Sequence, residues 1–126
     1  MGKYLEEAKK YLEIGEKKIK EGKEKNIIEK AVNGCDKVWL SFNLALKEFF
    51  LQKGVKEEEL PKTYRGTRFM VVKHGGKELI DLFEKVREVF HITGYYDRDP
   101  MFEEIEMRLE EIKEFYKNLE DKKEGL

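Results

Sequence analysis

Apolar residues recur every three or four positions along almost the whole chain, and no segment alternates apolar and polar residues with a period of two. Such spacing places apolar side chains on one face of an α-helix, whereas a half-buried strand requires alternation. In the segment 27–52 the apolar residues cover much of the helix circumference. Because such a helix must contact several neighbours, we expect this segment at the centre of the fold.

The same spacing predicts three further long helices and a short one. They are expected at residues 3–21, 66–74 and 77–92, and from Pro100 onward. Short turns between these segments predict an all-α fold, an antiparallel up-and-down four-helix bundle with an additional short helix. Since 126 residues are enough for one core, residues 1–126 are predicted to form a single domain.

Several residues carry signals for helix ends. Gly22 is predicted to end the first helix, because glycine adopts the left-handed conformation at low cost. Asn26 and Glu29 have the spacing of a capping box at the start of the second helix. Asp99 is expected as the N-cap of the last helix, with Pro100 in its first turn.

The last helix has the most regular apolar pattern. Its apolar residues are spaced by three and four positions in alternation, which predicts a seam packed against one flat partner. The residues of this seam are Phe102, Ile105, Leu109, Ile112, Tyr116 and Leu119.

Charged residues make up 42% of the chain, yet the net charge is only −1, so no global field attracts nucleic acid or anionic lipid. Lys and Glu dominate while Asn, Gln, Ser and Thr are scarce. This bias is typical of proteins from hot environments and predicts a thermophilic prokaryotic source. No apolar run approaches the roughly 18 residues that span a bilayer, and the charged amino terminus is unlike a signal peptide, so no membrane association is expected.

The single cysteine, Cys35, excludes an internal disulfide and favours a reducing compartment, so a cytoplasmic location is predicted. Cys35 lies among helix-forming residues and is expected to be buried and inert. Two histidines and one cysteine are too few and too scattered for a zinc site. The sequence therefore predicts no metal and no cofactor.

The strongest local charge asymmetry lies between Pro61 and Lys77, where there is no Asp or Glu. The five cations of this stretch are Lys62, Arg65, Arg68, Lys73 and Lys77. Such a stretch fits the phosphates of RNA or of a nucleotide. It fits equally well an acidic partner surface, such as helix 103–114 of a second subunit, or a plain solvated loop.

Two Arg and His pairs are candidates for chemistry. Arg87 and His91 are four residues apart, so on an α-helix they share a face. The simpler interpretation is a surface ion pair of Arg87 and a His91 that caps the last helical turn. In the rival pair, Arg68 and His74 lie six residues apart and face apart on one continuous helix, so they converge only if the chain turns near Gly75.

Two segments together resemble the HEPN superfamily, named for higher eukaryote and prokaryote nucleotide-binding. The segment AVNGCDKVWLSF, residues 31–42, resembles its central helix, and VREVFHITGYYDRDP, residues 86–100, resembles the Arg and His region before its final helix. The similarity covers nearly the whole chain and is closest to a group of short archaeal repeat-family proteins. It implies a helical homodimer.

Within that superfamily some members are metal-independent ribonucleases, some are partners of nucleotidyltransferases, and others bind or scaffold without catalysis. The nuclease motif is an Arg, four to six residues and a His. By this resemblance Arg87 would hold a phosphate and His91 would transfer a proton. Only three residues separate the two here, which departs from the nuclease motif.

We therefore expect a dimeric HEPN-like protein that binds nucleotide or RNA, or a nucleotidyltransferase-like subunit. The expected binding residues are Lys62, Arg65, Arg68, His74, Tyr95 and Tyr96, the last two as stacking platforms for bases. The alternative is a metal-independent ribonuclease that uses Arg87 and His91 in a dimeric cleft. A third possibility is a self-associating bundle without a ligand.

Overall fold

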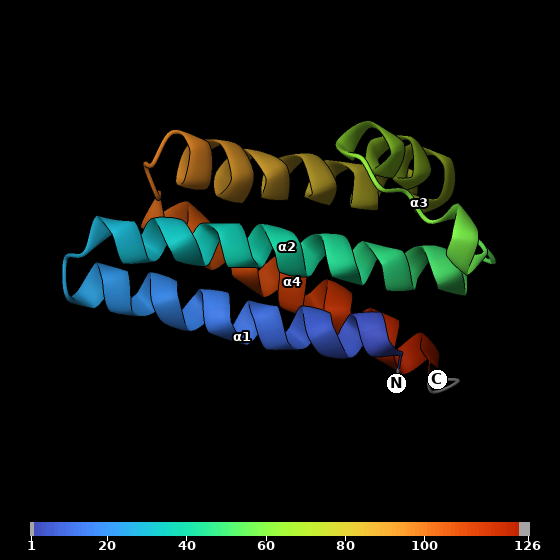
Figure 1. The fold of residues 1–126 in the computed structure, drawn as a ribbon, viewed down its shortest axis with the longest axis horizontal. Coiled ribbons are helices and arrows are strands. Elements are labelled where there is room, and N and C mark those ends of the chain that lie inside the picture. The colour runs from blue at the N-terminus through green and yellow to red at the C-terminus, as the bar shows by residue number, and fades with distance from the viewer. Residues whose placement is uncertain (1, 124–126) are drawn as a thin grey trace.

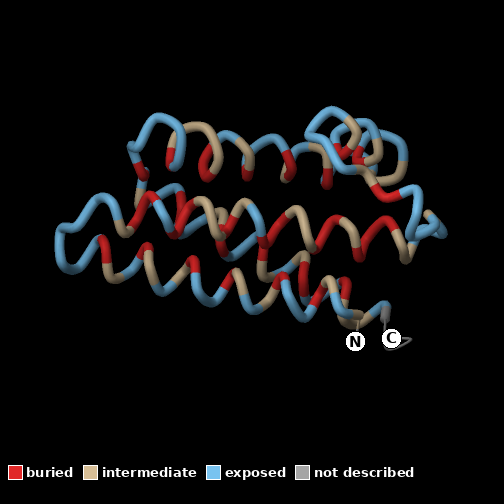
Figure 2. The backbone as a smooth tube through the Cα atoms, viewed as in Figure 1, coloured by how far each residue is buried: buried red, intermediate tan, exposed pale blue. Residues whose placement is uncertain are grey.

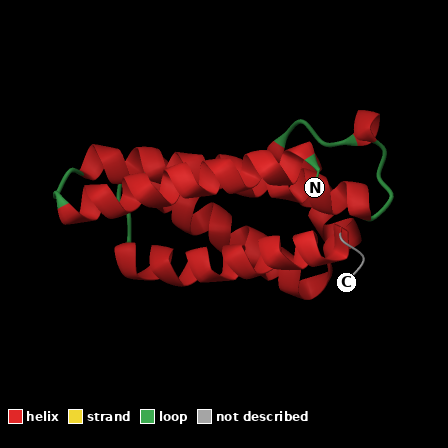
Figure 3. Cartoon of the chain, turned by 90° about the horizontal axis from the view of Figure 1, so that it is seen from below, coloured by secondary structure: helices red, strands yellow, loops and turns green. Residues whose placement is uncertain are grey.

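The computed structural model describes residues 2–123, and within them it contains helices and no strand. In chain order the elements are α1 (Lys3–Glu24), α2 (Ile28–Gln52), the 3₁₀ turn η1 (Glu57–Glu59), α3 (Tyr64–Val86), the π-helix η2 (Arg87–Tyr96) and α4 (Phe102–Lys123). They pack as a helical bundle, joined by short loops (Figures 1 and 3). In this part of the chain, no helix combines the length and the apolar character needed to cross a bilayer.

Helix α2 lies at the centre, as its apolar pattern predicts. It contacts α1, α3, η2 and α4, and α1 runs antiparallel beside it along most of its length (Figure 1). Buried positions recur at intervals along these helices, between exposed ones (Figure 2). The largest fully buried side chains are the rings of Phe42 and Phe50 from α2, Phe83 from α3 and Phe90 from η2.

The predicted apolar face of α4 is confirmed, but it packs against α1, α2, α3 and η2 rather than against one flat partner. Five of its six residues are buried, namely Ile105, Leu109, Ile112, Tyr116 and Leu119. The helix begins at Phe102, however, which is two residues later than expected. Asp99 does not cap it, and its backbone N–H instead donates to the carbonyl of Thr93, 3.0 Å away, so Asp99 closes the end of η2.

Gly22 does not end α1, which continues to Glu24. A Cβ on Gly22 would lie 2.6 Å from the backbone nitrogen of Ala31, so this glycine lets α1 and α2 approach closely. The reversal is made instead by Asn26, whose φ of 56° is left-handed. The predicted capping box of Asn26 and Glu29 is therefore wrong: Ile27 occupies the N-cap of α2 and makes no side-chain capping bond.

Helix α3 is two helices joined at Gly76, where φ is 75° and ψ is 174°. We call residues 64–75 the first half of α3 and residues 77–86 the second half. The prediction of a break at this point is confirmed, and in Figure 1 the first half is seen almost end-on while the second half runs along the bundle. The first half starts at Tyr64, because Thr63 is a side-chain cap whose Oγ1 accepts from the N–H of Gly66 at 3.0 Å.

The second half of α3 does not stop at Ile92 but continues as η2 to Tyr96. In η2 the hydrogen bonds span five residues, so each turn is wider than in an α-helix. Gly94 permits this turn to press on α2, since a Cβ there would lie 2.6 Å from the Sγ of Cys35. The wide turn changes which side chains of residues 87–96 line up, and this affects the candidate site.

Candidate functional site

Five aromatic side chains from α2, α3 and η2 form a continuous series of ring contacts, which we call the aromatic row. In order, its members are Tyr96, His91, Trp39, Phe83 and Tyr64. The centroids of successive rings are 5.0, 4.9, 5.9 and 5.9 Å apart. Phe83 is buried, whereas 65% of Tyr96 and 41% of Tyr64 are exposed. The row therefore has an apolar middle and two accessible ends.

Arg87 closes the row at Tyr64. The centre of its guanidinium group lies 4.2 Å from the centroid of the Tyr64 ring, a cation–π contact. Its Nε is buried and has no hydrogen-bond partner in the described part of the chain, where Arg87 also forms no ion pair. The sequence-based alternative of a surface ion pair for Arg87 is therefore wrong.

His91 is held between two rings rather than at a helix end. It stacks on Trp39 with an interplanar angle of 21°, and the ring of Tyr96 meets it edge-on. Because η2 continues to Tyr96, His91 does not cap a last turn, contrary to the simpler interpretation. Burial and the charge of Arg87 lower the pKa of His91, while Asp36 opposes them, so the imidazole is neutral at pH 7.

Arg87 and His91 thus touch the same aromatic row at different points. Arg87 lies on Tyr64 and His91 lies on Trp39, with Phe83 between the two aromatic partners. They remain close enough for the arginine to act on the histidine's pKa. Nδ1 of His91 is buried without a partner among the described residues, which leaves Nε2 as the ring nitrogen that a ligand can reach.

Two pockets border the row and share Tyr64. The first, of about 420 Å³, is also lined by Arg68, Arg87, Glu84 and Glu88. The second, of about 400 Å³, has only Tyr64 in common with the first. Its lining includes Trp39, Asp36, Asn43, Lys47, Lys62 and Thr67. Both pockets are lined by cations and by carboxylates, so neither has the purely positive lining of a simple anion-binding site.

The structure brings only some of the predicted binding residues together. Lys62 lines the second pocket, and Arg68 lines the first while forming a 3.2 Å ion pair with Glu84. Tyr95 lies beside Tyr96, with ring centroids 5.7 Å apart, at the exposed end of the row. These residues surround the row from both sides.

Arg65 and His74 lie elsewhere. Arg65 is exposed on the outer face of the first half of α3, and His74 packs near Phe50 at a ring distance of 6.4 Å. The rival pair of Arg68 and His74 does not converge, because the break at Gly76 follows both residues and leaves them on opposite sides of one helix.

Neither Trp39 nor Tyr64 is among the site residues predicted from the sequence. In the structure both are half-exposed members of the site. The sequence does carry a sign that Trp39 is partly exposed. Asp36, Trp39 and Asn43 follow one another at helical spacing on α2, which places polar side chains on the same face as the indole. Within residues 2–123, no cluster of three or more His, Cys, Asp or Glu side chains is arranged to hold a metal.

Comparison of this chain with protein-family models, with curated proteins and with solved structures gave no match. The chemistry of the aromatic row and its pockets is therefore the basis for assigning a function.

Proposed function

We propose that this protein binds a nucleotide or a short single-stranded RNA segment at the aromatic row. Tyr96 and Tyr64 are the exposed ends on which bases stack, and stacking of this kind contributes about 1–3 kcal/mol per base. Arg87 and Arg68 are placed beside Tyr64 to meet a phosphate. The neutral His91 offers Nε2 for a hydrogen bond to a base or a ribose.

The observation that carries this proposal is the position of Arg87. A guanidinium group lies over an exposed tyrosine ring at the edge of a pocket, with a buried Nε that has no partner in the described chain. A group with an unmet hydrogen-bonding capacity beside a partly exposed tyrosine is suited to a ligand that carries both a ring and an anion. Nucleotides have this combination.

The finer family assignment belongs to the same proposal. We infer an up-and-down, HEPN-like topology, in support of which α1 and α2 run antiparallel and a long helix precedes the Arg and His segment. A homodimer, a nucleotidyltransferase-like partner, a cytoplasmic location and a thermophilic archaeal source remain predictions from the sequence. No metal or cofactor is required for the proposed binding.

Binding is tested by fluorescence anisotropy with a labelled single-stranded oligouridine and with a labelled adenine nucleotide. We expect Tyr96→Ala and Arg87→Gln each to weaken binding about tenfold or more. Matched controls are Tyr11→Ala on α1 and Arg98→Gln, whose ion pair with Glu29 lies apart from the row. Equal affinity of the wild type and both row variants, or no binding of either probe, would exclude the proposal.

A metal-independent ribonuclease is the second candidate, and one observation favours it. The pKa of His91 is lowered, so the imidazole is unprotonated at neutral pH and can accept a proton from a 2′-OH. The test is incubation with labelled RNA in EDTA. Products with 2′,3′-cyclic ends that disappear in His91→Ala would establish cleavage, whereas intact RNA together with retained binding supports the binding function alone.

A further inference from the structure

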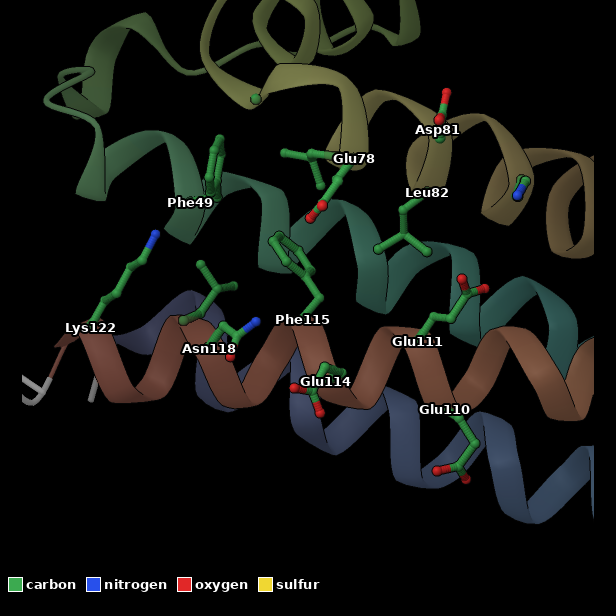
Figure 4. A pocket seen from close by; sticks show the side chains of 14 residues that line it. Phe49, Glu78, Asp81, Leu82, Glu110, Glu111, Glu114, Phe115, Asn118 and Lys122 are labelled. Atoms are coloured by element: carbon green, nitrogen blue, oxygen red, sulfur yellow. The ribbon is translucent and has the colours of Figure 1, made fainter.

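A groove of about 650 Å³ shares no lining residue with the aromatic row. It lies between the second half of α3 and α4, with part of α2 at its base (Figure 4). Its floor is apolar, and Figure 4 shows Leu82 and Phe115 reaching into it from the two helices. The other apolar lining residues are Phe49, Leu79 and Leu119.

Carboxylates dominate the rim of this groove. Five line it, namely Glu78, Asp81, Glu110, Glu111 and Glu114, against the two lysines Lys85 and Lys122. Two of these carboxylates have neighbours of opposite charge on α4, since Arg108 pairs with Glu111 and Lys113 lies 4.0 Å from Glu110.

The other three carboxylates, Glu78, Asp81 and Glu114, form no ion pair with any described residue. The groove therefore presents apolar surface inside a negatively charged rim. A ligand that suits it has apolar side chains flanked by cations.

The outer face of the first half of α3 has this complementary character. Phe69 and Val72 are 64% and 51% exposed, although both are large apolar residues. They are flanked on the same helical face by Arg65 and Lys73. No Asp or Glu occurs between positions 61 and 77. Exposed apolar side chains framed by cations are typical of a docking helix rather than of a solvated one.

The two surfaces also match in length. The groove follows α4 from Glu110 to Lys122, which corresponds to about 18 Å of helix. The exposed stripe from Arg65 to Lys73 spans about 12 Å, so it fits within the groove. The helix cannot fill the groove of its own chain with this stripe, because the opposite face, with Thr67 and Val71, is buried against the bundle.

We propose that two copies of this protein pair by docking the outer face of the first half of α3 of each copy into the groove of the other. Phe69 and Val72 cover the apolar floor, and Arg65 and Lys73 meet the carboxylates of the rim. In this proposed pair each copy supplies one helix and one groove, and the two identical contacts are related by a two-fold axis. None of the residues named on the two surfaces belongs to the aromatic row.

Sedimentation equilibrium of the full chain without RNA tests the pairing separately from ligand binding. The wild type is expected to be a dimer whose dissociation constant rises with salt, since charges contribute. Phe69→Asp should weaken the dimer roughly thirtyfold or more, as expected for a central apolar contact. Met107→Asp is the matched control: Met107 is 60% exposed on α4, lies outside the groove, and its replacement should leave the dimer intact.

Charge reversal on each surface identifies the occupant. Arg65→Glu with Lys73→Glu, and separately Glu78→Lys with Glu114→Lys, should each give monomers with unchanged helical circular dichroism. In a mixture of these two variants, each mixed pair has one charge-swapped contact and one wild-type contact, so the mixture should sediment as a heterodimer. A monomeric wild type, open polymers in place of a dimer, a dimer that survives Phe69→Asp, or failure of the mixture to associate would overturn the proposal.

Discussion

His91 stacks on the indole of Trp39 with ring centroids 4.9 Å apart, so a histidine of η2 is fixed against the central helix α2. Three influences set the pKa of His91: its partial burial, Arg87 on its own helix and Asp36 on α2. The partial burial and the charge of Arg87 disfavour the charged imidazolium. The neutral form of the ring is therefore favoured while it packs between Trp39 and Tyr96.

We predict that Arg87→Gln raises the pKa of His91 toward its ordinary value of about 6.5, because it removes a repelling positive charge. The rise is partial, since burial is the larger cause of the lowering and remains. Asp36→Asn should move the pKa in the opposite direction, further down. Proton NMR titration of the imidazole resonances measures both changes, and identical titration curves for the two variants would contradict this account.

The same lowered pKa of His91 gives a dependence of stability on pH. The unfolded chain binds a proton to this histidine at higher pH than the folded chain does. The free energy of unfolding is therefore greater above about pH 6.5, and it falls as the pH drops through the pKa of the folded state. Urea unfolding between pH 8 and pH 5 measures this. His91→Gln should flatten that part of the profile, and an unchanged slope in this variant would show that other groups cause it.

Ser41 connects three helices through one hydroxyl group. It donates to the carbonyl of Ala8 on α1 and lies 2.7 Å from the hydroxyl of Tyr116 on α4, and all three residues are buried. Ser41→Ala leaves the hydroxyl of Tyr116 without this partner, which we expect to cost about 1–3 kcal/mol of unfolding free energy. In Ser41→Ala with Tyr116→Phe, part of that loss should return. Urea unfolding measures these free energies. If the losses of the two single variants simply added in the double variant, Ser41 and Tyr116 would not be coupled.

The positions that sequence periodicity predicts well are those that depend on one helix alone. The α4 seam from Ile105 to Leu119 is an example, because the spacing of three and four decides which face is apolar whatever covers it. The centrality of α2 follows in the same way from its wide apolar arc.

Positions that depend on two helices are predicted less well. Gly22 has the sequence signature of a helix end, yet in the structure it allows α1 to approach Ala31 of α2 closely. A helix end and a close helix contact both favour a residue without a Cβ, so the sequence alone does not distinguish them. In η2, one wide turn changes the neighbours of Arg87 and His91, and periodicity within a single segment carries no sign of it. The aromatic row likewise joins Trp39 to residues more than forty positions away, a relationship that exists only after packing.

Cys35 is predicted to be unreactive in the folded protein. It is fully buried, and burial raises the pKa of its thiol to about 12, with Asp36 adding to the rise. Since the thiolate is the reacting form, an aromatic disulfide reagent at pH 8 should label the native chain far more slowly than the chain in urea. Equal labelling rates in the two conditions would mean that η2 opens readily from α2 at Gly94.

The close approach of α1 and α2 predicts a large penalty for one added methyl group. A Cβ on Gly34 would lie 2.6 Å from the carbonyl oxygen of Gly15, and a Cβ on Gly15 would lie 2.8 Å from the carbonyl oxygen of Gly34. Both atoms belong to backbone, which cannot move aside as a flexible side chain does. Gly34→Ala should therefore force the helices apart and cost about 1–3 kcal/mol, more than alanine gains in helix propensity.

The matched control for Gly34→Ala is Asn33→Ala, one position away on the exposed face of α2. There the same methyl side chain meets solvent, so helix propensity alone acts and stability should rise slightly. Thermal unfolding followed by circular dichroism compares the two variants with the wild type. If Gly34→Ala unfolded at or above the wild-type temperature, a Cβ would fit between α1 and α2. That result would contradict the close approach of Gly15 and Gly34.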